Sequence, residues 1–312
     1  MSHLRPLADE DPADVIACEG LSIRYGETVA VDDVRFRVPR GAVYVLLGRN
    51  GAGKSSAIRC ILGQQRPSSG AVRLFGADVW SARAALMARI GVVPEEPDAP
   101  PGMTVAELAA FSRRLYQRWD DAALSARVRR FEIPTTVPFR RLSKGQKTQV
   151  ALSLALASSP DLLVLDDPTL GMDIVARREL YGELIGELAD RGTTVLLTTH
   201  ELSEVEGIAT HVGILRRGRL VIDEQLDQLK GRVRQIRCAH GPADVHKALA
   251  PFEPFAIHTD RSGFDAVVGR YEPSAFDRFR RSTGIVEAEA MPLSLADIFA
   301  TVVREQSQGG DA

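Results

Sequence analysis

The residues with the clearest chemical meaning lie at positions 48–56, where the chain reads Gly-Arg-Asn-Gly-Ala-Gly-Lys-Ser-Ser. Gly48, Gly53, Lys54 and Ser55 fit the phosphate-binding pattern G-x-x-x-x-G-K-[ST]. Glycines let backbone N–H groups converge on phosphate oxygens, while the lysine adds positive charge and the serine offers a hydroxyl to Mg²⁺. A glycine turn that only packs is the weaker interpretation, because these fixed positions co-occur by chance on the order of once in a hundred such chains.

The flanking residues predict the elements that hold this loop. Residues 43–47 are apolar and favour a strand, whereas residues 56–62 have helical spacing. A strand, a glycine loop and a helix in this order turn the positive end of the helix dipole toward the phosphates.

A pair of carboxylates ends another predicted strand. Residues 161–168 read Asp-Leu-Leu-Val-Leu-Asp-Asp-Pro, a short apolar run that ends in Asp166 and Asp167. Such a run is typical of a buried parallel strand, whose carboxyl end reaches the active crevice of an open sheet. A carboxylate at this place is where Mg²⁺ would be held.

Two further segments could serve the same chemistry. Ser143-Lys144-Gly145-Gln146 has capping-box spacing before the apolar run at 150–157, which predicts a helix start with outward-pointing N–H groups. His200 follows the predicted strand Thr194–Thr198. Taken alone, a histidine at such a position is more often structural than catalytic.

The elements that position these residues begin with two alternating runs, Ile16–Ile23 and Val29–Val38, which predict antiparallel strands. Tyr25 lies in the turn between them, where its ring could stack on a base or cover the core.

Residues 103–149 are helical in character and carry ten basic against four acidic side chains. That surface is either a solvated face or one that lies near anionic lipid or an acidic partner.

Composition sets the broad class. The chain has 312 residues, of which 45% are hydrophobic and 26% charged, as in ordinary globular proteins, and its length suggests two domains. The net charge of −2 provides no global field for nucleic acid, so we expect no nucleic-acid partner. No stretch approaches the roughly 18 apolar residues of a membrane helix, so a membrane role would depend on another chain.

The cysteines and the amino terminus indicate a reducing compartment. Cys18, Cys60 and Cys238 are odd in number, far apart and without metal-ligand spacing, which argues against a disulfide framework. Residues 1–14 lack an apolar core, so we expect a flexible lead-in rather than a signal peptide.

Six motifs occur along the chain, at Tyr25, residues 48–56, residues 142–146, residues 162–167, Asp173 and His200. In this order they resemble the ATP-binding cassette (ABC) ATPases, specifically the cytosolic subunits of ABC exporters. The resemblance covers roughly residues 15–228. It implies the P-loop NTPase fold of that family, an α/β fold with a mixed-sheet core, an antiparallel β subdomain and a helical subdomain at about residues 95–159. We expect residues 229–312 to form a separate accessory domain.

The resemblance also implies roles for single residues. Tyr25 would stack on adenine, Lys54 would contact the β- and γ-phosphates, and Asp166 would hold the metal with Ser55. The implied nucleotide-binding set is Tyr25, Gly48, Arg49, Asn50, Gly51, Ala52, Gly53, Lys54, Ser55 and Ser56.

Further motifs imply a dimer. The family signature corresponds to Ser143, Lys144, Gly145 and Gln146, which would cap the γ-phosphate of ATP held by a second chain. Asp173 falls at the D-loop, and His200 falls at the switch histidine that senses the γ-phosphate, where it would act in catalysis. The resemblance thus implies a head-to-tail dimer with ATP between the chains.

Two departures from the family pattern bear on catalysis. Asp167 stands where the family usually has a catalytic Glu, and the shorter side chain draws the carboxylate back by roughly 1 Å, a misplacement that can cost about 100-fold in rate. We therefore predict slow or partner-dependent hydrolysis.

Glu95 stands where a Gln usually touches Mg²⁺, and its carboxylate could still coordinate the metal. Lys144, with Tyr116 and Trp119 upstream, resembles the ABC-2 subgroup of bacterial exporters.

Residues beyond 228 contain no catalytic cluster. The pattern predicts strands at 235–239, 255–258, 264–268 and 285–290 and helices at 243–249, 273–281 and 294–303. The order β-α-β-β-α-β resembles the ferredoxin-like motif. Support of a dimer, contact with a membrane partner and regulation all stay open as roles of this domain.

The sequence therefore predicts an ATPase subunit of a bacterial ABC-2-type exporter. With ATP and Mg²⁺ as cofactors, it would dimerise with a second ABC ATPase chain and drive an integral-membrane permease from the cytoplasmic face of the membrane. The alternative is an ATP-dependent dimerisation switch, or regulatory half of a heterodimer, with little hydrolysis. A soluble ABC protein that acts on DNA or ribosomes is disfavoured, because its long coiled coil or second cassette is missing from the sequence.

Overall fold

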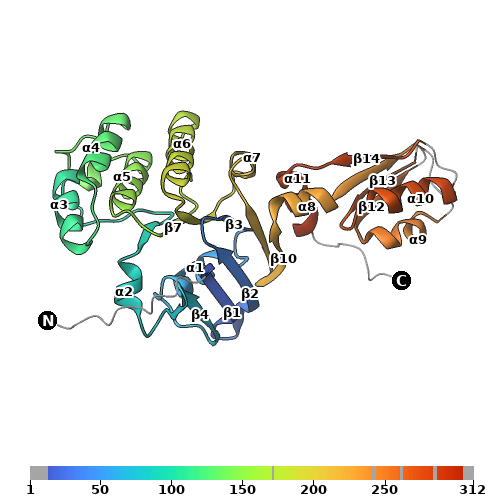
Figure 1. The fold of residues 1–312 in the computed structure, drawn as a ribbon, viewed down its shortest axis with the longest axis horizontal. Coiled ribbons are helices and arrows are strands. Elements are labelled where there is room, and N and C mark those ends of the chain that lie inside the picture. The colour runs from blue at the N-terminus through green and yellow to red at the C-terminus, as the bar shows by residue number, and fades with distance from the viewer. Residues whose placement is uncertain (1–12, 171, 240–243, 261–262, 284–286, 305–312) are drawn as a thin grey trace. The chain divides into compact units, whose positions relative to one another are not determined.

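The chain divides into two units, Met1–Asp223 and Glu224–Ala312, in the computed structural model (Figure 1). The structure describes residues 13–170, 172–239, 244–260, 263–283 and 287–304. The predicted lead-in, residues 1–14, lies almost wholly outside the described residues. The division falls before the boundary predicted after residue 228, because Glu224 already pairs with Arg232 inside the second unit.

A six-stranded sheet in the order β10-β9-β3-β8-β7-β6 forms the centre of the first unit. Its strands are β3 (Val43–Gly48), β6 (Ile90–Val93), β7 (Leu162–Asp166), β8 (Thr194–Thr198), β9 (His211–Arg216) and β10 (Arg219–Gln225). Five neighbouring strands, β9, β3, β8, β7 and β6, run parallel to one another. They are almost entirely buried on both faces, and for this reason their sequences are apolar throughout and do not alternate with polar residues. Parallel pairing brings the carboxyl ends of β3, β7 and β8 to the same edge of the sheet.

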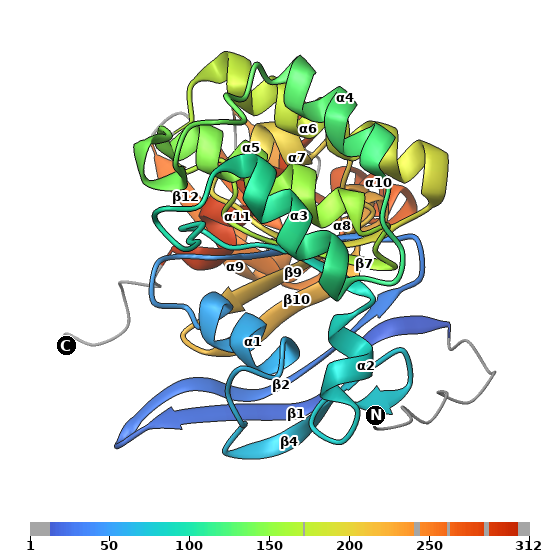
Figure 2. The same ribbon diagram turned by 90° about the vertical axis from the view of Figure 1, so that its left-hand side faces the viewer.

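An antiparallel sheet in the order β2-β1-β4-β5 packs nearby. It consists of β1 (Asp14–Tyr25), β2 (Thr28–Pro39), β4 (Ser69–Leu74) and β5 (Ala77–Asp78). Helix α1 (Lys54–Ile61) lies between the two sheets (Figure 2), and one hydrophobic core joins Ile16 of β1, Ala57 of α1 and Leu46 of β3. Strand β4 begins at Ser69, which pairs with Ser22 of β1.

Helices α3 (Val105–Leu115), α4 (Asp121–Arg130) and α5 (Lys144–Ala157) gather on one side of the six-stranded sheet (Figure 1). The capping box predicted at Ser143 is formed, and a second capping box forms at Thr104. The remaining helices of this unit are α2 (Arg83–Met87), α6 (Ile174–Arg191) and α7 (Leu202–Val205), with a 3₁₀ turn at Phe139–Arg141. Part of the predicted basic surface is paired with an acidic residue, because Arg127 and Arg130 of α4 contact Glu183 of α6 at 2.9 and 2.6 Å, and the Arg127 side chain is mostly buried in this contact.

The second unit confirms the ferredoxin-like topology. After α8 (Leu226–Arg232), the elements are β11 (Arg234–Cys238), α9 (Val245–Leu249), a 3₁₀ turn at Ala250–Phe252, β12 (Pro254–Asp260), β13 (Gly263–Val268), α10 (Pro273–Thr283), β14 (Glu289–Pro292) and α11 (Leu295–Val303). The antiparallel sheet has the order β12-β13-β11-β14, as this motif requires. The predicted strand 285–290 is wrong in position, since β14 begins at Glu289, where pairing with Arg237 starts. Residues 284–286, residue 243 and the turn residues 261–262 lie outside the described residues.

Buried thiols occur in both units. Cys18 in β1 and Cys60 in α1 belong to the core between the two sheets of the first unit, and Cys238 in β11 belongs to the core of the second. Burial raises the pKa of Cys60 to about 11.

None of the helices in the described part of the chain is both long and apolar enough to span a bilayer.

Candidate nucleotide site

The phosphate loop connects the end of β3 to the start of α1. Gly51 and Gly53 adopt positive φ angles of 80° and 106°, which L side chains rarely adopt. A Cβ atom at Gly53 would lie 2.4 Å from the carbonyl oxygen of Ala30, so only glycine fits there. The helix begins at Lys54, two positions earlier than the helical spacing predicted, and its free N–H groups open into the loop.

Lys54 is held inside this loop. Its side chain is 9% exposed, and Nζ donates a hydrogen bond to the carbonyl oxygen of Gly48 at 2.6 Å. Burial lowers the pKa of Lys54, and the carboxylates of Asp167, Asp166 and Glu95 act against that shift. The structure therefore brings the predicted lysine into the electrostatic neighbourhood of all three predicted carboxylates, which come from distant segments.

The two aspartates at the end of β7 have different surroundings. The hydroxyl of Thr198 donates a hydrogen bond to Oδ1 of Asp166 at 2.6 Å. Asp167 follows in a left-handed conformation with φ 45°, and its N–H bonds to the carbonyl and hydroxyl oxygens of Thr198, both at 3.0 Å. Thr198 thus holds the carboxylate of Asp166 and the backbone of Asp167, and this role was not predicted from the sequence. Its position at the end of the neighbouring strand is the only signal that could have indicated it.

His200 lies directly beside Asp167. Its Nε2 atom is 3.1 Å from Oδ2 of Asp167, whose residue is only 6% exposed. Burial raises the pKa of Asp167, while His200 and Lys54 counteract the rise. A buried carboxylate paired with an imidazole can orient a water molecule and accept its proton, which is the arrangement that hydrolysis of a phosphoanhydride needs.

Tyr25 lies at the end of β1, next to α1. Its hydroxyl donates a hydrogen bond to Oε1 of Gln65 at 2.6 Å and contacts Oγ of Ser56 at 3.2 Å. The hydrogen bond with Ser56 is the main cause of a lowered pKa of Tyr25. Since the residue is 45% exposed, it does not cover the core, and Gln65 is a second partner that sequence reasoning missed.

The donor atoms of this site fit Mg²⁺ bound with a nucleotide. Ser55 in the first turn of α1 and Asp166 at the end of β7 both offer oxygen atoms. Mg²⁺ takes oxygen ligands in octahedral geometry and commonly binds one or two carboxylates together with substrate phosphates and water. Glu95 is exposed in the loop after β6 and adds a third oxygen donor to the neighbourhood.

The predicted signature residues and Asp173 lie at the starts of two helices of the first unit. Ser143 and Gln146 form a capping box at the start of α5, with bonds of 3.2 and 3.0 Å to each other. Lys144 and Gly145 occupy the first turn of this helix. Asp173 is exposed and caps α6 by accepting a hydrogen bond from the N–H of Ala176 at 2.9 Å.

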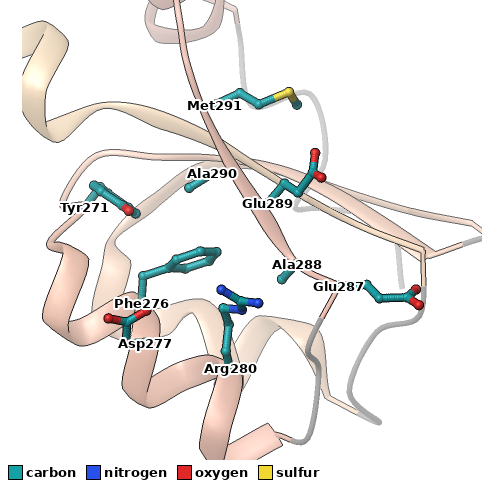
Figure 3. Close-up of a pocket in the computed structure, with 9 residues that line it drawn as sticks. All are labelled: Tyr271, Phe276, Asp277, Arg280, Glu287, Ala288, Glu289, Ala290 and Met291. Carbon is teal, nitrogen blue, oxygen red and sulfur yellow. The ribbon is translucent and has the colours of Figure 1, made fainter.

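The second unit contains an open pocket of about 560 Å³. Figure 3 shows Phe276 and Arg280 of α10 pointing toward β14. The pocket is lined by Tyr271, Phe276, Asp277, Arg280, Glu287, Ala288, Glu289, Ala290 and Met291. It lacks the glycine loop and helix start of a phosphate site, so we assign it no part in nucleotide binding.

Comparisons with known proteins agree on one family. The ABC transporter family matches residues 31–170. The bacitracin transport ATP-binding protein of Bacillus licheniformis is 31% identical over 261 residues, which cover 82% of this chain and 85% of that protein. The Nod factor export ATP-binding protein I of Burkholderia thailandensis is 31% identical over 303 residues, 91% of this chain and 95% of that protein.

Solved structures agree with this fold. The structure of an ATP-binding subunit of an ABC transporter superposes with a TM-score of 0.64 at 28% identity, and the match covers 70% of this chain and 92% of that one. A dimeric structure of a bacterial ABC transporter cassette gives a TM-score of 0.62 at 21% identity over 68% of this chain and 98% of that one.

Proposed function

Because the chain belongs to the ABC transporter ATP-binding family and is similar to exporter subunits, we propose that it hydrolyses ATP to drive export. The observation that carries this proposal is the convergence of Lys54, Asp166, Asp167 and His200 at one edge of the parallel sheet. Of these groups, Lys54 binds the phosphates, while Asp167 and His200 position the attacking water.

Catalysis in this proposal is mainly positioning and charge stabilisation. Mg²⁺ neutralises charge on the phosphates when it is bound through Ser55 and Asp166, with Glu95 as a further donor. The loop N–H groups and Lys54 are fixed in place before the nucleotide arrives, so little reorganisation is needed as charge develops. Tyr25 offers its exposed ring to the adenine base.

We propose that two ABC chains close around two ATP molecules in head-to-tail fashion. Ser143, Lys144, Gly145 and Gln146 then cap the γ-phosphate held by the partner chain. The capped start of α5 supports this assignment, because the first N–H groups of a helix have no partner within the helix and can bind an anion. Closure passes to an integral-membrane permease at the cytoplasmic face of the membrane.

The first test is steady-state ATP hydrolysis with Mg²⁺ by the purified chain and by Lys54→Ala. Loss of one preorganised charge that stabilises a transition state costs about 10²–10³ in rate, so we expect turnover to fall by that factor. Lys247→Ala, which removes an exposed lysine of the second unit, is the matched control and should leave turnover unchanged.

The result also separates the proposal from its alternative. A chain that binds ATP without turnover, alone and with a co-purified membrane subunit, would support a dimerisation switch or the regulatory half of a heterodimer. Asp167 in place of the family's usual Glu is the observation that favours this second candidate. A chain that neither binds nor hydrolyses ATP contradicts both.

A further inference from the structure

A cluster of buried polar side chains lies around Arg177 and Tyr181 of α6. Of the six buried side-chain polar atoms without a hydrogen-bond partner in the described residues, four belong to this cluster: Thr169 Oγ1, Arg177 Nε, Tyr181 Oη and Glu204 Oε2. They belong together, because Thr169 and Glu204 both influence the pKa of Tyr181, which burial raises. Buried polar atoms that stay unsatisfied in a native protein call for an explanation, and a functional site is a common one.

Arg177 of α6 is the only positively charged group among these four residues, and its guanidinium joins two segments. Nη1 is 2.9 Å from Oε1 of Glu201 and 3.9 Å from Oε1 of Glu204. Nη2 donates a weaker hydrogen bond to the carbonyl oxygen of Met172 at 3.4 Å. The arginine side chain is only 18% exposed, so little water screens these contacts.

The ion pair of Arg177 with Glu201 reaches the residue next to His200. Glu201 follows His200 directly in the chain, while the ring of His200 is held by Asp167 at 3.1 Å. Met172 directly precedes Asp173, the exposed residue that caps α6. A short path of contacts therefore runs from Asp173 through Met172, Arg177 and Glu201 to His200.

We propose that Arg177 is a positioning residue that holds His200 against Asp167 and makes this position depend on Met172 and Asp173. The inference rests on the proposed ATP hydrolysis, because His200 and Asp167 are the groups that act on the water. A contact that a second chain makes at Asp173 then reaches His200 through Arg177. An ion pair with a merely structural role would affect stability without a specific effect on the histidine.

The test compares changes on both sides of the ion pair. Arg177→Met approximately keeps the length of the side chain and removes its charge. Glu201→Gln removes the charge of the other partner, whose side chain is partly exposed. We expect either change to lower kcat by about 10- to 100-fold, the range that a shift of about 1 Å in a catalytic group produces, with KM within about 2-fold. Arg177→Lys should recover most of the rate.

A matched control lies on the same helix. Arg178 is exposed at the next position of α6, so Arg178→Met should leave kcat and KM unchanged. The combined variant Arg177→Met with Glu201→Gln should be no slower than either single variant, because both break the same contact. Full additivity of the two losses would contradict the proposal.

A readout independent of turnover separates this inference from the proposed function. In NMR spectra of ¹⁵N-histidine-labelled protein, with the ring signals of His200 assigned by His200→Gln, Arg177→Met should shift those signals and Arg178→Met should not. Unmoved signals in both Arg177→Met and Glu201→Gln overturn the inference, whether or not the chain hydrolyses ATP. If Arg177→Met does not fold, Glu201→Gln alone decides.

Discussion

At the scale of single residues, Asp167 has a backbone conformation that non-glycine residues seldom adopt. Its φ angle of 45° directs the short side chain toward His200, and the Thr198 bonds to its N–H fix that conformation. Left-handed conformations of this kind cost free energy and are retained at functional sites. The fold thus brings the shorter carboxylate to the imidazole without the extra methylene of a glutamate.

Asp167→Glu tests whether this compensation is complete. If the aspartate is too short, the added methylene should raise turnover by about 10-fold or more, since a misplacement of about 1 Å can cost 100-fold. The measurement is steady-state ATP hydrolysis, with Asp167→Asn as the inactive reference. Unchanged or lower turnover, beside good turnover of the unmodified chain, means that the aspartate is already placed correctly.

The sequence predicted the residues of the site better than the contacts between them. Lys54, Asp166 and Asp167 follow from local patterns, because a glycine loop and an apolar strand each specify their own ends. The hydrogen bonds of Thr198 and the ion pair of Arg177 join distant segments, so no local pattern specifies them. Their roles depend on which strands become neighbours, and only the folded chain sets that.

At the scale of elements, one carboxylate connects three segments of the first unit. Asp161, just before β7, accepts hydrogen bonds from Nε of Arg89 at 2.6 Å and from Nη1 of Arg118 at 3.1 Å. Arg89 precedes β6, and Arg118 lies between α3 and α4. Burial acts to raise the pKa of Asp161, but the two arginines outweigh it, and the pKa lies below the ordinary value.

Asp161→Asn should therefore destabilise the chain in a pH-dependent way. Above the unfolded pKa of about 3.9 the ionised carboxylate stabilises the fold, and this contribution is lost as the pH falls through the lower pKa of the folded state. We expect a loss of about 1–2 kcal/mol at pH 7, between the values for exposed and buried ion pairs. Thermal unfolding at several pH values measures it.

The control for this prediction is an aspartate without such partners. Asp98 is exposed in the proline-rich loop, and its carboxylate accepts a hydrogen bond from the neighbouring Ala99 N–H. Asp98→Asn should change stability by less than about 0.5 kcal/mol at every pH. A difference between Asp161→Asn and the unmodified chain that persists unchanged near pH 3 contradicts the ion-pair account.

Elements with strong local signals were predicted well, and those that depend on pairing were not. The capping boxes at Thr104 and Ser143 specify their helices because the bonds lie within four residues. The predicted start of β14 was wrong, because the partner strand decides where pairing begins, as Arg237 does for Glu289. Strand ends are thus a property of the sheet more than of the strand.

At the scale of the whole molecule, the second unit has what an independent domain needs. Its sheet is complete, and its own core includes Ile236, Leu249, Phe264, Phe276 and Phe279. Two of these rings, Phe276 and Phe279, stack with centroids 6.1 Å apart. Domains with their own core and few crossing contacts commonly fold alone.

We therefore expect the fragment Glu224–Ala312 to fold without the first unit. Its stability should be on the order of 5 kcal/mol, as is usual for a small domain. Urea unfolding followed by circular dichroism measures this value, and dispersed amide signals in an NMR spectrum would show a fixed core. A fragment that remains unfolded in native buffer contradicts the division of the chain into two independent domains.

Because Cys18, Cys60 and Cys238 are all buried, we expect the native thiols to react little with labelling reagents. Burial raises the pKa of the Cys18 and Cys60 thiols, so few thiolates are present to react with a maleimide dye at neutral pH. A single cysteine introduced at an exposed position, as in Arg178→Cys, would then carry the dye without removal of the native thiols. Energy transfer between donor- and acceptor-labelled copies could follow, in real time, the approach of two chains when ATP is added.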